Sequence, residues 1–259
     1  MQGPLTSHVD DFLQAGSPVF EKLVAKKMKE KFMLSREEEL EFRYVGINMK
    51  QNLNCLAIDQ EHYIKNLQPI PVPDTVVGEP NVKQFRRLVG SLNWASIISR
   101  PDISFDVVDL STRFPAPSLE DFVKANKVVK RVQSIPVGIN YPKLCLDSRL
   151  RIVVFSDGSF RNLCDGVSSG SGWIVFLVDG VLNCCVISWA SKKLQREVDS
   201  TSAVESLALS NAVKEALYIK MVMQELLPRE VCLPIYAITD RKGIHQAVHS
   251  TKLVDDKTT

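Results

Sequence analysis

Residues 151–159 read Arg-Ile-Val-Val-Phe-Ser-Asp-Gly-Ser, an apolar strand that closes on an acidic residue, Asp157. A second predicted strand, over residues 233–239, runs into Asp240 in the same way. Between them, a helix predicted over residues 202–227 carries Glu205 in its first turn. Two strand ends and one helix start can meet at one point, and three anions in a core are costly unless a cation neutralises them. The pattern therefore predicts a site for a divalent metal ion.

Each of these acids also has an ordinary structural interpretation. Asp157-Gly158 could form a turn after the strand. Ser202 and Glu205 have the spacing of a capping box, and Asp240 could cap the helix that follows it. Glu205, however, shares a helical face with residues that should pack on the sheet, namely Leu209, Ala212 and Ala216. Such a face is an unusual place for a purely structural carboxylate.

The order of the elements after residue 144 indicates an α+β fold. The expected strands and helices lie near 151–156, 171–178, 184–190, 202–227, 233–239 and 241–249. The first three strands have short connections and should form an antiparallel meander. The last strand arrives through a helical crossover and can pair parallel to the first. The expected result is a mixed sheet covered by helices.

The first 143 residues divide at two stretches rich in proline. The first contains Pro69, Pro71, Pro73 and Pro80. Before it we expect a hairpin, a helix that begins at Ser17-Pro18 and a strand pair, at residues 4–12, 17 onward, 42–49 and 53–58. After it we expect three helices, over 82–98, 100–112 and 119–134, and then a boundary at Pro136, Gly138 and Pro142. Three segments are therefore predicted, 1–80, 81–143 and 144–259.

The charge balance limits how this chain can meet nucleic acid. Its formal net charge is only +2 over 259 residues, so any nucleic-acid surface must be a local patch. One basic stripe is predicted on the helix at 119–134, formed by Lys124, Lys127, Lys130 and Arg131. A plainly solvated helix face and a track for phosphates are equally good interpretations of this stripe.

Targeting signals and cysteine usage point to an intracellular protein. No stretch is long and apolar enough to span a bilayer, and the N-terminus lacks the pattern of a secretory signal. The six cysteines (Cys55, Cys145, Cys164, Cys184, Cys185 and Cys232) show no metal-ligand spacing. We expect reduced, mostly buried thiols, a cytoplasmic or nuclear location, and no membrane partner.

Short motifs accompany the three acids in a fixed order. They are Phe155-Ser-Asp157, Ser169-Gly-Ser-Gly-Trp173, Ile187-Ser-Trp-Ala-Ser-Lys-Lys193, Ser200-Thr-Ser-Ala-Val-Glu205 and Thr239-Asp240. Together they resemble a ribonuclease H domain, and more narrowly the version found in copia-type retrotransposons. The resemblance implies a ribonuclease H-like mixed sheet of the five-stranded type with flanking helices.

The same resemblance implies a two-metal nuclease that cuts the RNA strand of an RNA–DNA hybrid. Asp157, Glu205 and Asp240 would hold two Mg²⁺ ions about 3.5–4 Å apart, for which Mn²⁺ can substitute, to activate water and stabilise the leaving 3′-oxygen. Phosphate contacts would come from Ser200, Ser202, Ser159 and backbone amides near Gly158. The 2′-hydroxyl would distinguish RNA from DNA.

One departure from the family concerns a fourth acid, which usually lies in a last helix. The late acids of this chain are Asp255 and Asp256, and the chain stops at Thr259 before such a helix. The metal set is therefore expected to be incomplete.

The upstream half has a resemblance of its own. His8-Val9-Asp10-Asp11 is similar to the aromatic-x-Asp-Asp turn of reverse transcriptases, with histidine in place of tyrosine or phenylalanine. Later motifs follow in the order of a copia-type polymerase: Asp11-Phe-Leu-Gln-Ala-Gly16, Phe42-Arg-Tyr-Val-Gly-Ile47, Tyr63-Ile-Lys-Asn-Leu67, Phe85-Arg-Arg-Leu-Val-Gly-Ser-Leu-Asn-Trp94 and Ser99-Arg-Pro-Asp102. Nearly the whole chain thus resembles part of a retrotransposon Pol polyprotein.

That resemblance implies a palm end with a thumb-like segment over 1–80, a helical connection over 81–143 and the ribonuclease H-like domain over 144–259. The third catalytic aspartate, the fingers and the nucleotide-binding face would precede Met1. Asp10 and Asp11 are therefore expected to be vestigial, with no independent polymerase activity. The missing N-terminal part of the polymerase is a candidate partner, beside an RNA–DNA hybrid.

Two functions stay open on the sequence alone. The first is metal-dependent hydrolysis of the RNA strand of an RNA–DNA hybrid, which the three acids favour. The alternative is a catalytically inactive remnant or co-opted module that binds nucleic acid or protein, which the missing fourth acid and polymerase front favour. An unrelated α/β protein with acids placed by chance is the least supported interpretation.

Overall fold

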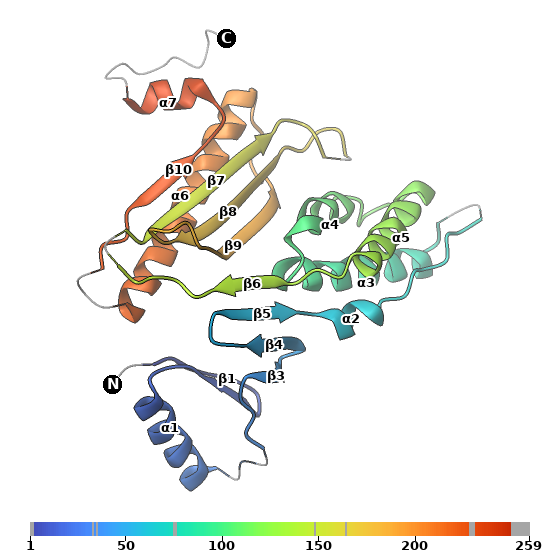
Figure 1. Cartoon of the computed structure of the whole chain (residues 1–259). Coiled ribbons are helices and arrows are strands. Elements are labelled where there is room, and N and C mark those ends of the chain that lie inside the picture. The colour runs from blue at the N-terminus through green and yellow to red at the C-terminus, as the bar shows by residue number, and fades with distance from the viewer. Residues whose placement is uncertain are drawn as a thin grey trace.

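Two four-stranded sheets organise the chain, with a separate hairpin before them (Figure 1). The computed structural model describes residues 3–32, 34, 36–74, 77–147, 149–163, 165–227 and 231–249. These residues form an α+β protein, as the sequence predicts. Among the helices of these segments, none combines the length and the hydropathy that a bilayer span requires.

The N-terminal hairpin and the first helix form as predicted. Strands β1 (Leu5–His8) and β2 (Asp11–Gln14) pair antiparallel. Helix α1 (Pro18–Lys31) is capped by Ser17, whose hydroxyl accepts a hydrogen bond from the Phe20 N–H at 3.3 Å. No residue of α1 is buried, so this unit contributes little to either core.

The predicted strand over 42–49 is wrong, because the chain reverses in the middle of it. Strands β3 (Glu41–Tyr44) and β4 (Ile47–Gln51) form a hairpin there. The turn residues Val45 and Gly46 have φ values of 49° and 77°. A two-residue turn with both φ angles positive matches the twist of the strands that it joins.

The first sheet is completed by a strand from a distant part of the sequence. Its order is β3-β4-β5-β6, where β5 is Cys55–Asp59 and β6 is Ile139–Pro142. The stretch predicted as a boundary therefore supplies a strand, which pairs antiparallel with β5. This pairing joins the segment 1–80 to the end of the segment 81–143, and the predicted division itself stays a prediction.

Helices between β5 and β6 form the first core. They are α2 (Glu61–Lys65), α3 (Glu79–Ile98), the short 3₁₀ helix η1 (Pro101–Ile103), α4 (Ser104–Ser111) and α5 (Leu119–Ser134). The apolar faces of α3 and α5 are buried against each other, as Phe85 and Phe122 show with their rings 5.2 Å apart.

An internal arginine ties this layer together. The fully buried Arg100 donates to the carboxylate of Asp102 and to the backbone carbonyls of Val132 and Ile135. The guanidinium holds the pKa of Asp102 below its ordinary value. A buried charge is tolerated here because each of the three guanidinium nitrogens finds an acceptor.

The second sheet follows the predicted topology. Its order is β10-β7-β8-β9, with β7 (Arg151–Ser159), β8 (Gly170–Val178), β9 (Cys184–Lys193) and β10 (Ile235–Ile238). The meander β7-β8-β9 is antiparallel and β10 is parallel to β7. Within the described residues this sheet has four strands, not the five that the resemblance implies, since the chain enters α7 (Lys242–His249) after β10.

Helix α6 (Thr201–Leu226) covers one face of this sheet. Its buried alanines, Ala212 and Ala216, pack against the inward side chains of β7 and β8, such as Ile152 and Val175. Small side chains let the helix lie close to the strands. Helix α4 packs against β9 of the same sheet.

Hydrogen bonds between described residues connect the first sheet and its helices to the C-terminal sheet. The Trp189 indole Nε1–H in β9 donates to the Ser96 carbonyl in α3 at 2.7 Å. The Cys185 thiol donates to the Pro142 carbonyl at the end of β6 at 3.3 Å.

The expectation of mostly buried thiols is wrong for the described cysteines. Cys55, Cys145, Cys184, Cys185 and Cys232 are all free thiols, but of these only Cys185 is buried. Cys184 and Cys185 lie on opposite faces of β9 because successive strand residues alternate.

The packing of α5 gives a stability prediction. Phe122→Ala should lower the free energy of unfolding by about 3–5 kcal/mol, because the ring is fully buried between α3 and α5. The neighbouring Val123 is 40% exposed, so Val123→Ala should cost less than about 1 kcal/mol. Urea denaturation measures both, and equal losses would contradict this picture of the core.

Candidate metal centre

The structure brings the three predicted acids together. Asp157, Glu205 and Asp240 each offer a carboxylate oxygen, and these oxygens all lie within 4.8 Å of one another. Two of the positions follow from strand register: Ile238 in β10 is opposite Phe155 in β7, so Asp240 comes level with Asp157. The third position depends on where α6 begins.

Helix α6 can reach the strand because Gly158 has no side chain. A Cβ at Gly158 would lie 2.9 Å from Val204 Cγ1 and 3.0 Å from the Glu205 backbone nitrogen. The Gly158 N–H in turn donates to Glu205 Oε2 at 3.2 Å. The glycine therefore both admits the helix and orients its carboxylate beside Asp157.

Two of the ordinary structural interpretations of these acids are wrong. Asp157 and Gly158 do not form a turn, because they lie inside β7 and pair with Gly172 and Ser171 of β8. Ser202 and Glu205 do not form a capping box either. The N-cap of α6 is Ser200, whose hydroxyl accepts from the Ala203 N–H at 3.2 Å.

The electrostatics of Glu205 fit a cation site. This side chain is 8% exposed, and burial is the main cause that raises its pKa above the ordinary value of 4.5. The charges of Asp157 and Asp240 raise that pKa further, while the Gly158 hydrogen bond opposes the change. Three carboxylates are hard oxygen ligands of the kind that Mg²⁺ and Mn²⁺ prefer, and a divalent ion would relieve their repulsion. The residues present therefore fit a divalent metal ion.

A cleft of about 750 Å³ opens beside the acids on the face of the sheet away from α6. Asp157 and Asp240 line one part of it, and apolar side chains of the sheet line much of the rest. The cleft also reaches Phe105 of α4, so the helical layer and the C-terminal sheet both contribute to its walls.

The residues predicted to contact phosphates differ in how exposed and how engaged they are. Ser159 lines the cleft at the end of β7. Ser200 and Ser202 are half-buried at the start of α6, where the Ser200 hydroxyl is engaged as the cap. The Gly158 amide is engaged by Glu205 and is not free for a phosphate.

The predicted basic stripe on α5 is partly neutralised. Lys124 pairs with Asp109, and Arg131 pairs with Asp106, both on α4. Lys127 and Lys130 are exposed. The stripe thus presents two exposed lysines, and its role as a phosphate track stays a prediction.

The hairpin of β1 and β2, which contains Asp10 and Asp11, lies across the first sheet from the C-terminal sheet (Figure 1). Asp10 is in the hairpin turn and Asp11 begins β2. In the described segments, no third histidine, cysteine, aspartate or glutamate joins them in a metal-like group. Late acids Asp255 and Asp256 lie outside the described residues.

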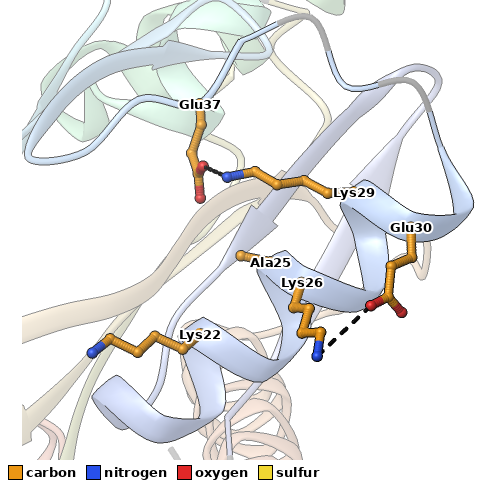
Figure 2. Close-up of a pocket in the computed structure, with 6 residues that line it drawn as sticks. All are labelled: Lys22, Ala25, Lys26, Lys29, Glu30 and Glu37. Atoms are coloured by element: carbon orange, nitrogen blue, oxygen red, sulfur yellow. Dashed lines mark ion pairs between the residues drawn. The ribbon is translucent and has the colours of Figure 1, made fainter.

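A shallow hollow on α1 has a different character (Figure 2). It is lined by Lys22, Lys26 and Lys29 together with Glu30 and Glu37. Two ion pairs cross it, Lys26 with Glu30 and Lys29 with Glu37, and their side chains are largely exposed. Exposed ion pairs contribute little to stability, and this hollow holds no set of catalytic groups.

Sequence reasoning missed the contributions of the helical layer. Phe105 lines the cleft, and Ser96 fixes Trp189 through its carbonyl. No sequence signal identifies them, because their relevance depends on how α3 and α4 dock against β9.

Comparison with curated proteins supplies a family context. A scan against models of protein families finds no match. Over 241 residues the chain is 27% identical to the retrovirus-related Pol polyprotein from transposon RE1 of Arabidopsis thaliana, covering 85% of this chain and 16% of that protein. The Pol polyprotein from transposon TNT 1-94 of Nicotiana tabacum, a copia-type element, is 26% identical over 208 residues, covering 79% and 15%. The chain is a relative of retrotransposon Pol polyproteins.

The predicted resemblance to retrotransposon Pol polyproteins is thereby confirmed. The chain spans only 16% and 15% of the length of these two Pol relatives. An uncharacterised mitochondrial protein of Arabidopsis thaliana is closer in length, at 24% identity over 230 residues, 82% of this chain and 92% of that protein.

The raised pKa of Glu205 predicts a pH effect on stability. The folded chain binds this proton more tightly than the unfolded chain, so Glu205 lowers the free energy of unfolding as pH rises from about 4.5 through its folded pKa. Urea denaturation in a metal chelator should show this decline in the wild type and its loss in Glu205→Gln. Glu225→Gln, at an exposed position of the same helix, should keep the wild-type pH dependence. Parallel curves for the wild type and Glu205→Gln would contradict the assignment.

Gly158→Ala tests the close approach of α6. The added methyl group should displace the start of the helix, lower the free energy of unfolding by about 1–3 kcal/mol and weaken Mn²⁺ binding. Gly90→Ala is the control, since a Cβ at this exposed position of α3 would meet no heavy atom within 4 Å. Denaturation and calorimetric titration with Mn²⁺ measure the two effects. A Gly158→Ala variant that binds Mn²⁺ like the wild type would refute the proposed role of the glycine.

Proposed function

We propose that this chain hydrolyses phosphodiester bonds with the help of divalent metal ions, acting on the RNA strand of an RNA–DNA hybrid. The observation that carries the proposal is the convergence of Asp157, Glu205 and Asp240 on one point. A desolvated glutamate beside two aspartates is a costly arrangement that a bound cation would offset. The relationship to Pol polyproteins supports the same function.

In this proposal the three carboxylates hold Mg²⁺, for which Mn²⁺ can substitute. Bound metal supplies Lewis acidity and neutralises the charge that develops on the phosphate. Asp157 and Asp240 keep their places through the register of β7 and β10. Glu205 keeps its place because the Gly158 N–H binds one of its carboxylate oxygens.

The fold proposed for residues 144–259 is ribonuclease H-like. An antiparallel meander, a parallel fourth strand and a helix across one face support it. For the upstream residues we propose the end of a reverse-transcriptase palm with a thumb-like segment, and then a helical connection. Asp10 and Asp11 are proposed to be vestigial, and the remainder of a polymerase is the proposed protein partner.

Several side chains are proposed to position the hybrid. Ser159, which lines the cleft with Asp157 and Asp240, is proposed to contact a phosphate beside the cut. Ser200 and Ser202, which shortly precede Glu205 at the start of α6, are proposed to do the same. Lys127 and Lys130 offer exposed charge for the backbone farther away. A 2′-hydroxyl near the acids would distinguish the RNA strand.

The direct test is cleavage of a labelled RNA–DNA hybrid in Mg²⁺ or Mn²⁺. The wild type should cut only the RNA strand. Asp157→Asn should slow cleavage at least about 100-fold, equivalent to about 2.7 kcal/mol, because it removes a metal-ligand charge. Glu197→Gln, at an exposed position before α6, is the matched control and should cleave like the wild type.

The controls separate the proposal from its alternative. Equal cleavage by wild type and Asp157→Asn would indicate a contaminating nuclease. No cleavage by either protein, together with retained binding of the hybrid, would refute the nuclease and support an inactive binding module.

A further inference from the structure

Two glycines of β8, Gly170 and Gly172, line the cleft beside the acids. On the face of the sheet away from α6, Gly172 pairs with Asp157 and Gly170 pairs with Ser159. A Cβ at Gly170 would lie 2.9 Å from Ser159 Oγ. β8 therefore offers only backbone at Gly172, opposite Asp157, while the Ser159 side chain lies over Gly170.

Aromatic and aliphatic side chains form other walls of the cleft. Phe155 and Ile238 are 43% and 42% exposed, although they face a cleft on a folded sheet. Phe176 packs edge-to-face on Phe155 at 6.1 Å and holds its ring in place. Phe105, which is 45% exposed, faces the same cleft from α4.

The apolar walls and the acids lie at the spacing of a nucleotide. Phe155 precedes Asp157 by two residues on β7, which is about 7 Å along the strand. Ile238, opposite Phe155, ends β10 two residues before Asp240. A mononucleotide spans a similar distance from its phosphate to its base. The volume of about 750 Å³ also falls in the range of small-molecule sites, roughly 300–1,000 Å³.

We propose that this cleft binds a nucleobase whose own phosphate lies at the three acids. Base–aromatic stacking suits Phe155 and Phe105, because every base has a flat face. Ser104, Asn162 and Ser191 also line the cleft and offer hydrogen bonds to base edges. The proposal rests on the proposed metal centre, since Asp157 and Asp240 would repel a phosphate without a cation.

A base in this cleft cannot remain stacked in a duplex. The chain should therefore prefer a substrate with an unpaired nucleotide beside the scissile phosphate, as at a gap, an end or a bulge. Unstacking costs less for a base that is already unpaired. The cleft would thus make the chain prefer hybrids with an unpaired nucleotide at the cut, a preference that the three acids alone do not provide.

The test compares two probes on the full chain in Mg²⁺, adenosine 5′-monophosphate and ribose 5-phosphate. The nucleotide should bind at least about fivefold more tightly, the lower end of what base stacking provides. Phe105→Ala should bring the two affinities together without changing that of ribose 5-phosphate. Ile97→Ala is the control, because Ile97 is 54% exposed on α3 and does not line the cleft. Fluorescence or magnetic-resonance titration measures these affinities.

The outcomes separate the base site from the metal centre. Equal affinity for the two probes in Mg²⁺ would overturn the base site and leave the metal centre intact. Affinities that respond neither to Mg²⁺ nor to Asp157→Asn would overturn the metal centre and the base site with it. Sedimentation that shows a dimer, dissociated by Phe105→Ala, would assign the cleft to a second copy and also overturn the proposal.

Discussion

The close approach of α6 to the backbone of β7 at Gly158 is the contact on which the rest of the site depends. A helix can lie against a strand at this separation only where the strand lacks a Cβ, and a β-carbon here would meet the helix backbone at 3.0 Å. The contact brings Glu205 beside Asp157 and uses the Gly158 N–H to hold its carboxylate. The parallel pairing of β10 with β7 then adds Asp240.

This arrangement concentrates like charge where solvent is scarce. Burial and two neighbouring aspartates disfavour the ionised form of Glu205, so its ionisation without a bound cation opposes folding. The second core offsets that cost, since Ile152, Val154, Val175, Ala212 and Ala216 are fully buried. Different parts of α6 therefore serve the site and the core. Its start carries the acid, and its later turns carry the small apolar residues that pack on the sheet.

Local patterns were sufficient to predict most elements and the three acids. Strand alternation and helical spacing identify β7–β9, α3, α5 and α6, and Asp157, Glu205 and Asp240 stand out because strand ends converge. Features set by distant contacts were missed. The turn at Val45-Gly46, the β5–β6 pairing, the Ser200 cap and the pairing of Lys124 and Arg131 with α4 all depend on neighbours that sequence spacing does not specify.

The pairing of β6 with β5 has a consequence for how the chain folds. Ile58 is opposite Ile139, so the first sheet closes a loop of about 80 residues that contains the whole helical layer. Contacts of such long range form late, and until then β5 keeps an open edge that can recruit strands of other chains. Synthesis must therefore pass β6 before the upstream sheet is protected. Fragments cut between the helical layer and β6 are expected to aggregate even though each helix in them is intact.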